Sequence, residues 1–229
     1  MGSKNKLKKF KENLNFKNLF QPDRDELINK SFKLKGKWNK DFFKNENPIV
    51  LELGCGKGEY TTTLSKWNNN VNYIGIDIKG ARIWKGAKDS FENHLKNVCF
   101  IRTQIELIDH FFTKNEVDEI WITFPDPQQK IQRKKHRLTN PDFLKMYKKI
   151  LKKGGIVNLK TDSEFLHGYT LGLIEAMGIT PIFSNHDIYS NNNAPKEALE
   201  IQTFYEKKFL DSKKTVSYTH LTLPTSVIV

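Results

Sequence analysis

A glycine-rich loop after an apolar run is the first place in this chain where residue types and spacing suggest chemistry. The run Ile49–Leu53 contains the acid Glu52 and leads into Gly54, Gly56 and Gly58. Glycine allows a tight turn and lets a ligand approach the backbone with no Cβ in the way. The third glycine follows the second by two residues, whereas the dinucleotide fingerprint G-x-G-x-x-G needs three. We therefore expect a ligand-binding loop that does not hold a pyrophosphate.

Two polar residues end the next two apolar runs. Asp77 lies roughly twenty residues after the loop, where a carboxylate can accept hydrogen bonds from both hydroxyls of a ribose. Gln104 follows the third run and is placed to touch the edge of an adenine. The alternative is a plain strand–helix turn, in which Glu52 is a buried, satisfied acid and Gln104 is a surface residue.

A third acid, Asp126, stands between Pro125 and Pro127 after a fourth apolar run. Prolines stiffen a loop, and ligands of open α/β sheets bind at the carboxyl ends of strands. The eight residues Lys130–Arg137 follow, and six of them are basic or potentially basic. An acid beside a phosphate-binding run suits an enzyme that acts on RNA, so Asp126 is the predicted catalytic residue. The predicted RNA contacts are Arg133, Lys134, Lys135 and Arg137. The alternative is a proline-bounded turn with solvated lysines.

Apolar runs of strand length alternate with longer helical stretches from Pro48 onward. Strands are predicted at Ile49–Leu53, Asn72–Ile76, Val98–Arg102, Glu119–Phe124, Gly155–Thr161, Thr180–Ser184 and Ile201–Phe209. Helices are predicted at Tyr60–Trp67, Ala81–Leu95, Asn140–Leu151 and Ser163–Met177. This alternation predicts an α/β fold with a doubly wound, Rossmann-like sheet that is mostly parallel. The last two predicted strands lack a helix between them, so we expect a C-terminal antiparallel hairpin.

The net charge of +12 is confined to two segments of the 229-residue chain. Residues 1–46 hold 13 Lys and Arg against 6 Asp and Glu, and residues 127–153 hold 10 against 1, while the rest is mildly acidic. Two basic segments beside an acidic body are typical of a phosphate-binding surface on a catalytic domain. We expect a basic N-terminal extension over 1–46 that packs partly on the body, and a catalytic domain over 47–210.

We expect neither a membrane-spanning segment nor a secretory leader, because the basic start is followed by no apolar stretch and no run reaches the roughly 18 to 20 apolar residues of a membrane span. The chain's two cysteines suggest neither a disulfide framework nor a metal cluster, so we expect no metal and a reducing cytoplasm. Residues 211–229 are expected to form a tail that is non-native or disordered, because residues 216–229 suddenly lack charge and are rich in threonine and valine. We expect removal of residues 216–229 to leave activity unchanged.

At these motifs the chain resembles the bacterial tRNA (guanine-N7)-methyltransferase family, over roughly residues 48–210. The family's Asp-Pro-Trp-Pro-Lys-Lys-Arg-His run corresponds to Asp126–Arg133, with Gln128-Gln129 in place of Trp-Pro. Lys160-Thr161-Asp162 fits the family's substrate acid, and Thr203–Glu206 fits its Thr-x-Tyr/Phe-Glu motif. Gln104 and Asp77 stand where the family commonly has an acid and Glu.

The resemblance implies S-adenosylmethionine as the cofactor and tRNA as the partner, in a monomer or a homodimer. The implied contacts to S-adenosylmethionine are Glu52, Gly54, Gly56, Gly58, Asp77, Gln104 and Asp126. The implied contacts to the guanine or its surroundings are Lys130, Asp162, Thr203, Phe204, Tyr205 and Glu206. The implied reaction forms 7-methylguanosine at guanine 46 of the variable loop.

Guanine N7 carries an in-plane lone pair, so its methylation needs no general base. We expect positioning and fixed negative charge to be the enzyme's contributions, with Asp126 and Asp162 as acceptors for the guanine N1–H and exocyclic amine. Three alternatives are an amino-methylating enzyme, a nicotinamide-dependent dehydrogenase and a non-catalytic RNA-binding module. The first usually has an Asn/Asp-Pro-Pro-aromatic order that Phe124–Pro127 lacks, and the glycine spacing weighs against the second. The third is motivated by Gln104 and Gln128-Gln129.

Overall fold

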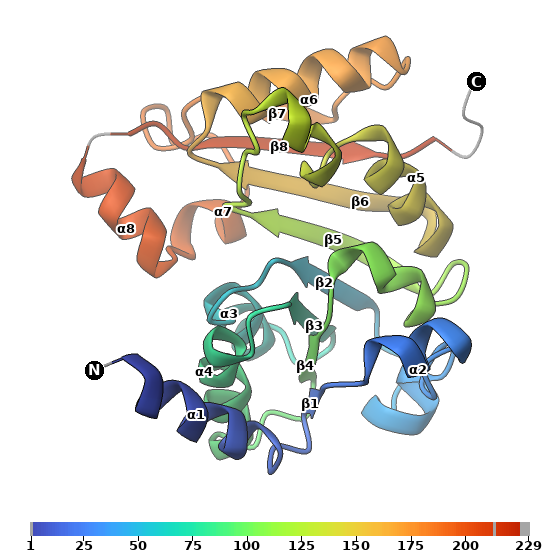
Figure 1. Cartoon of the computed structure of the whole chain (residues 1–229). Helices are drawn as coiled ribbons and strands as arrows, with labels where there is room; N and C mark the ends of the chain where they lie inside the picture. Colours follow the sequence, from blue (N-terminus) through green and yellow to red (C-terminus); the bar gives the residue numbers. More distant parts are fainter. Residues whose placement is uncertain (1, 213, 225–229) are drawn as a thin grey trace.

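A computed structural model describes residues 2–212 and 214–224 as one eight-stranded sheet with helices on both faces (Figure 1). The strands are β1 Leu19–Phe20, β2 Ile49–Leu53, β3 Asn72–Asp77, β4 Val98–Arg102, β5 Val117–Thr123, β6 Leu151–Thr161, β7 Phe183–Asn185 and β8 Ser217–Thr222. The helices are α1 Gly2–Asn13, α2 Arg24–Asn29, α3 Glu59–Trp67, α4 Gly80–Glu92, α5 Pro141–Ile150, α6 Glu164–Ala176, α7 Lys196–Glu200 and α8 Phe204–Asp211. Three short turns of other helix types are η1 Trp38–Phe43, η2 Ile105–His110 and η3 Ile131–His136.

The strand order is β1-β4-β3-β2-β5-β6-β8-β7, and the pairs from β1 to β6 are parallel. β8 pairs antiparallel with both β6 and β7. The predicted α/β sheet, mostly parallel with an antiparallel C-terminal end, is therefore confirmed. β2 and β4 have the predicted bounds, since both are largely buried on two faces and read as nearly continuous apolar runs.

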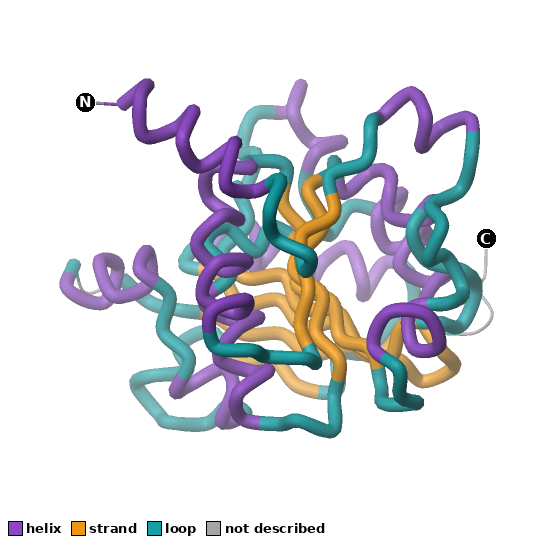
Figure 2. Tube along the Cα trace, turned by 90° about the horizontal axis from the view of Figure 1, so that it is seen from below, coloured by secondary structure: helices purple, strands orange, loops and turns teal. Residues whose placement is uncertain are grey.

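Each face of the sheet has its own hydrophobic core, and Figure 2 shows the twisted sheet between the two helical layers. Leu51 and Leu53 of β2 belong to the core beneath α5 and α6, whereas Val50 belongs to the core beneath α3 and α4. Successive side chains of a strand point to opposite faces, so a single strand can serve both cores. β2 is thereby fixed at the centre, and the loop after it is held on both sides.

The basic N-terminal region is built into this fold. The Asn13 side chain in α1 donates a hydrogen bond of 3.0 Å to the Gly80 carbonyl at the start of α4, and β1 extends the sheet beside β4. Trp38 is fully buried and donates from its ring N–H to the Phe111 carbonyl at 2.9 Å. Apolar residues of this region thus contribute to both cores, Trp38 to one and Leu19 to the other.

The predicted strand over Ile201–Phe209 is wrong, because α8 begins at Phe204. The strand that completes the sheet is β8, inside the segment expected to be a tail. Val216, Tyr218 and Leu221 are buried there, so the expectation of disorder is wrong for residues 217–222. Residues 213 and 225–229 of that predicted tail lie outside the described residues. Among residues 2–212 and 214–224, no helix has the length and apolar character to cross a membrane.

Candidate active site at the carboxyl edge of the sheet

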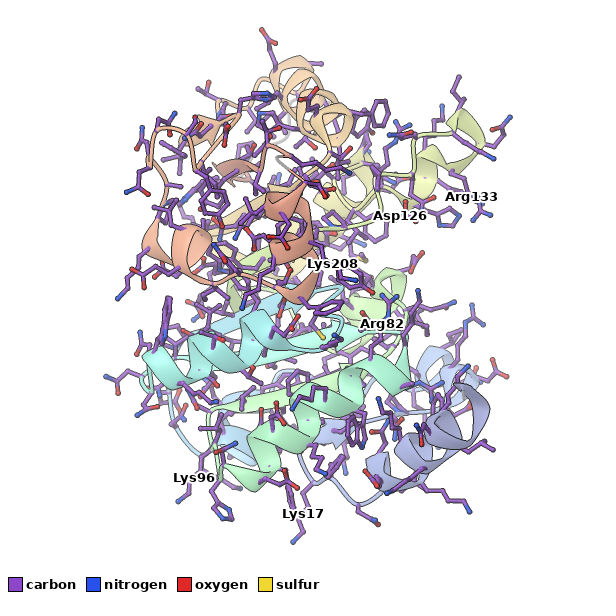
Figure 3. The ribbon with its side chains drawn as sticks, turned by 90° about the vertical axis from the view of Figure 1, so that its left-hand side faces the viewer. Lys17, Arg82, Lys96, Asp126, Arg133 and Lys208 are labelled. Atoms are coloured by element: carbon purple, nitrogen blue, oxygen red, sulfur yellow. The ribbon has the colours of Figure 1, made fainter. Side chains whose placement is uncertain are left out.

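A cavity of about 390 Å³ opens at the carboxyl edge of the sheet, where β2, β3, β4 and β5 end. Four residues predicted to bind the cofactor line it, one at or shortly after the end of each of these strands: Gly54, Asp77, Gln104 and Asp126. Figure 3 looks onto this edge of the molecule, with Asp126 beside Arg133, and Arg82 and Lys208 nearby. Sequence spacing therefore located the strand ends that meet in space.

The three glycines of the loop serve two different purposes. All have positive φ, at +76° for Gly54, +56° for Gly56 and +72° for Gly58. A Cβ on Gly54 would meet nothing within 4 Å, and one on Gly56 would reach the Gly54 carbonyl only at 4.0 Å. A Cβ on Gly58 would lie 2.6 Å from the Phe100 ring. Gly54 and Gly56 thus leave space for a ligand, while Gly58 allows close packing on β4.

Asp77 is held in place by the backbone of two neighbouring turns. Its carboxylate accepts hydrogen bonds from the Gly56 N–H at 2.9 Å and from the Lys79 N–H at 2.7 Å. Each carboxylate oxygen has a second lone pair, so Asp77 can still accept the hydroxyls of a ribose. Gln104 is exposed on the same cavity, and its carbonyl accepts a hydrogen bond of 3.2 Å from Arg24. Its amide N–H groups can donate to an adenine nitrogen.

Glu52 does not line the cavity, contrary to the expected direct contact with the cofactor. One of its oxygens accepts hydrogen bonds from the backbone N–H of Thr61, at 2.8 Å, and from the Thr61 hydroxyl. The other accepts a bond of 2.7 Å from the Thr123 hydroxyl. Burial raises the pKa of Glu52 to about 7, since desolvation disfavours the charged form. Glu52 ties β2 to α3 and β5 from beneath the loop, as the buried-acid alternative predicts.

The loop that carries Asp126 is tightly turned at both ends. Phe124 and Gln128 have φ of +48° and +47°, values that non-glycine residues rarely adopt. Asp126 is exposed, and its Oδ1 accepts a hydrogen bond of 3.1 Å from the Gln128 N–H. Such unfavourable backbone persists only where the surroundings impose it, and it often marks functional sites. This loop presents Asp126 at the rim of the cavity.

Arg137 contributes to this loop from inside the protein and does not belong to the exposed basic run. It is only 6% exposed, and its guanidinium stacks over the rings of Phe165 and Tyr169. It donates to the backbone carbonyls of Gln128 at 3.1 Å and of Gln129 at 3.4 Å. The prediction that Arg137 contacts RNA is therefore wrong for this structure, because its donors are used to fix the Asp126 loop.

The other predicted basic contacts remain available at the surface. Lys130, Arg133, Lys134 and Lys135 are all exposed, around the short helix η3. Asp162 follows β6, the strand next to β5, and is half-buried. It forms an ion pair of 3.9 Å with Lys214. Asp162 is not part of the cavity lining, although its strand ends at the same edge as the strand before Asp126.

Thr203 and Glu206 face inward and form the N-terminal cap of α8. Thr203 Oγ1 accepts a hydrogen bond from the Glu206 N–H, and Glu206 Oε2 accepts one from the Thr203 N–H, both at 3.2 Å. This reciprocal arrangement is a capping box. Glu206 is also paired with Lys160 at 2.6 Å, with both side chains fully buried. The expected contact of Thr203 and Glu206 with the guanine is wrong for this structure, because α8 and β6 use these groups.

Lys160 is a residue whose importance the sequence did not reveal. Besides Glu206, it donates to the Ile201 carbonyl at 3.0 Å. Burial lowers the pKa of Lys160, while the neighbouring Glu206 acts in the opposite direction. Tyr189 donates to Glu206 at 2.6 Å and completes this buried network. The only sequence signal for this pair is a lysine that directly follows Leu159, near the end of a predicted buried strand.

Phe204 and Tyr205, between Thr203 and Glu206, point outward with 43% and 41% of their surface exposed. Lys57 of the glycine loop lies 3.7 Å from the centroid of the Phe204 ring, and Arg82 of α4 lies 5.7 Å from that of Tyr205. The Phe204 N–H donates to Glu59 at 3.1 Å, which joins α8 to α3. Exposed rings among cations suit the stacking of unpaired bases beside their phosphates.

Comparison with known proteins places this edge in a chemical context. A family model described as a putative methyltransferase matches residues 46–219. The chain is 62% identical to a tRNA (guanine-N(7)-)-methyltransferase of Christiangramia forsetii, over 95% of this chain and 97% of that protein. It is 46% identical to a protein of the same name in Bacteroides fragilis, over 96% of this chain and 86% of that protein.

Solved structures agree on the fold at low sequence identity. A 16S rRNA methyltransferase matches with a TM-score of 0.61 and 14% identity, over 81% of this chain and 92% of the other. An antibiotic-related methyltransferase matches with a TM-score of 0.58 and 19% identity, over 84% of this chain and 95% of the other. These matches support the fold of the sheet, whereas the family relation rests on the sequence relatives.

Proposed function

The chain belongs to the tRNA (guanine-N(7)-)-methyltransferase family, and we propose that it transfers the methyl group of S-adenosylmethionine to N7 of guanine 46 in the variable loop of tRNA. The carboxyl-edge cavity is the proposed site of this reaction. The observation that carries the proposal is the meeting of the open glycine loop and Asp126 in one cavity of a chain with these relatives.

The residues at the cavity fit S-adenosylmethionine. The space beside Gly54 and Gly56, which a Cβ would fill, accommodates a ligand against the backbone. Asp77 accepts the ribose hydroxyls, and Gln104 contacts the adenine edge. The sulfonium of S-adenosylmethionine supplies an electrophilic methyl group when it is bound. The protein's part at this end of the cavity is to hold the donor in one orientation.

On the substrate side, Asp126 and Asp162 act as ionised acceptors for the guanine N1–H and its exocyclic amine. They follow the adjacent strands β5 and β6, so both can approach one planar base. Neither abstracts a proton, because N7 attacks through its own lone pair. Their fixed negative charge balances the positive charge that develops on the guanine ring, and it requires little rearrangement during the reaction.

The surroundings of the cavity are suited to an RNA whose target base has left its stack. Phe204 and Tyr205 offer exposed rings for an unstacked base. Lys130, Arg133, Lys134 and Lys135 lie beyond Asp126 and contact the phosphates. Arg137 holds the backbone of the Asp126 loop, so that Asp126 faces the cavity and the basic side chains after it face the solvent.

Methyl transfer to an unmodified tRNA transcript, followed by nucleoside mass spectrometry, tests this function. We expect 7-methylguanosine from the unaltered transcript and none from a matched transcript with adenine in place of guanine 46. A methyl group on an exocyclic amine or on a ribose would overturn the N7 assignment. Methylation of both transcripts would overturn the assignment of position 46.

A further inference from the structure

A second cavity, of about 790 Å³, lies at the opposite edge of the sheet, around the amino ends of β5 and β6. Its apolar floor includes Phe112, Ile150 and Leu151. Lys35, Lys114 and the five lysines of segment 145–153 also line it, and we term these seven lysines the amino-edge cluster. Asp109 is the one acid among the described residues of this lining.

The cluster is assembled by folding and is not just one basic run. Lys35 comes from the N-terminal region, Lys114 from the turn before β5, and the other five from the end of α5 and the start of β6. Lys145, Lys148 and Lys149 are spaced three and four residues apart, so they lie on one face of α5. The opposite face of α5 is buried through residues such as Phe143 and Tyr147. Three separate segments thus bring positive charge to one place.

Much of this charge has no acidic partner. Within the described residues, Lys149 forms an ion pair with Asp109 at 3.8 Å, and Lys152 forms one with Asp118 at 2.8 Å. The described residues show no ion pair for Lys114, Lys148 and Lys153. Clustered like charges repel one another, so holding them together costs stability unless a polyanion neutralises them.

The cluster is connected to the carboxyl edge through α5. Helix α5 begins just after the exposed run that ends at Lys135 and finishes at the amino-edge cluster (Figure 1). The seven residues of β5 separate the two edges by about 20 Å. One strand of a nucleic-acid duplex carries about six phosphates over that length. The spacing suits an RNA backbone that follows α5 from one edge to the other.

We propose that the amino-edge cluster binds the sugar–phosphate backbone of the tRNA about 20 Å from the target guanine. This inference rests on the proposed function, since it takes tRNA as the polyanion. The cluster holds the RNA without touching the reacting base, so it contributes to tRNA affinity and leaves the chemical step and the binding of S-adenosylmethionine unchanged.

The test is a variant with Lys114→Gln, Lys148→Gln and Lys153→Gln. A matched control carries Lys66→Gln, Lys85→Gln and Lys96→Gln, which removes the same charge from exposed positions outside the cluster and outside both basic segments. Lys96 appears in Figure 3 at the far end of the molecule from Asp126. Binding of unmodified tRNA is measured as a function of salt for both variants, together with the thermal midpoint and the affinity for S-adenosylmethionine.

We expect the cluster variant to bind tRNA about 10- to 100-fold more weakly at low salt, with a salt slope smaller by about two to three. The control should stay within about twofold of the unaltered protein, because exposed charges farther away than a Debye length are screened. The thermal midpoint should be equal or slightly higher in the cluster variant, because like charges that repel one another are removed, and unchanged in the control. Both variants should keep their affinity for S-adenosylmethionine. The KM for tRNA should rise in the cluster variant, with kcat unchanged.

Equal tRNA affinity and salt slope in the two variants would overturn the inference. If tRNA affinity and salt slope are equal in the two variants but only the cluster variant loses binding of poly-glutamate, the inference is overturned in favour of an acidic protein partner. If tRNA binding weakens as expected but the unaltered protein methylates no tRNA, the inference stands and the proposed function fails. The two failures are therefore distinguishable.

Discussion

The carboxyl edge of the sheet has two halves whose polar residues do different work. At the ends of β2 to β5, Gly54, Asp77, Gln104 and Asp126 line one cavity. Beyond β6, the motif Thr203–Glu206 turns its polar groups inward, to cap α8 and to pair with Lys160. Both halves carry motifs that predict ligand contacts, and only the first half places those groups on the cavity.

The difference lies in what the fold supplies around each acid. Glu52 and Glu206 are buried, and each meets side-chain donors inside the protein: two threonines and Lys160 respectively. Asp77 and Asp126 accept hydrogen bonds from backbone N–H groups and remain on the cavity. An acid at this edge of the fold is therefore structural where the interior offers it side-chain donors, and it is available to a ligand where the backbone alone orients it.

Ending the chain at Thr215 should cause the largest loss of stability among these predictions, and it tests the half of the edge beyond β6. The truncation removes β8 with the buried residues Val216, Tyr218 and Leu221. We expect a loss of roughly 5 to 8 kcal/mol, since each such side chain contributes about 1.5 to 3 kcal/mol. That loss approaches the whole stability of a typical domain. Urea denaturation followed by circular dichroism measures this loss of stability. The control is the full-length chain with Asp211→Ala, a change at an exposed position that keeps β8. If the truncated chain keeps its full stability, residues 216–229 are a dispensable tail, as the sequence predicted, and the fold does not need β8.

Lys160→Met should cost about 3 to 5 kcal/mol, because it leaves Glu206 buried without its cation. The double change Lys160→Met and Glu206→Leu should recover most of this loss, since it removes both charges. Lys152→Met breaks the exposed pair with Asp118 and should cost less than about 1 kcal/mol. If both single changes lower the free energy of unfolding equally, the distinction between buried structural acids and exposed acids is contradicted.

Asp126→Ala tests the other half of the comparison. We expect kcat to fall by about 100- to 1,000-fold, because a fixed charge that stabilises the transition state is lost. The affinity for tRNA should change little. Asp142→Ala, an exposed acid at the start of α5, removes the same charge and should leave kcat within about twofold. Steady-state methyl-transfer assays measure both variants, and unchanged turnover in Asp126→Ala would remove Asp126 from the site.

Glu52→Gln should change how stability depends on pH. The pKa of Glu52 is raised to about 7 from an ordinary 4.5, so the folded state binds its proton more tightly than the unfolded state does. Its contribution to stability is fully present below pH 4.5 and is lost as the pH rises towards 7. The full difference is about 3 kcal/mol. Denaturation from pH 4 to pH 8 should show this fall in the unaltered protein relative to the Gln variant, and parallel curves would contradict it.

The sequence predicted the parallel part of the fold and the residues that line the carboxyl-edge cavity because both depend on local pattern. Buried strands read as apolar runs, and residues after successive parallel strands meet at one edge. Glu52 and Glu206 were misassigned because their partners Thr61, Thr123 and Lys160 are brought to them only by folding. Spacing in the chain carries no information about such distant donors.

The C-terminal error has a similar cause. Ile201, Thr203, Phe204 and Tyr205 are residue types that strands favour, yet the reciprocal bonds between Thr203 and Glu206 start a helix. The segment of β8 has strand-forming residues, but its choice of partner depends on the exposed edge of β6. Arg137 was likewise grouped with its basic neighbours, although its burial is decided by Phe165 and Tyr169 of α6.

Calorimetric titration with S-adenosylmethionine most directly tests the claim that the open half of the edge is the cofactor site. Gly54→Ala and Gly154→Ala form a matched pair, because their φ values are +76° and +79° and a Cβ on either meets nothing within 4 Å. Both should therefore carry a similar backbone cost, whereas only Gly54 lines the carboxyl-edge cavity. We predict at least about tenfold weaker binding for Gly54→Ala, which corresponds to about 1.4 kcal/mol, and unchanged binding for Gly154→Ala. Equal affinity in the two variants would contradict the assignment of the cavity.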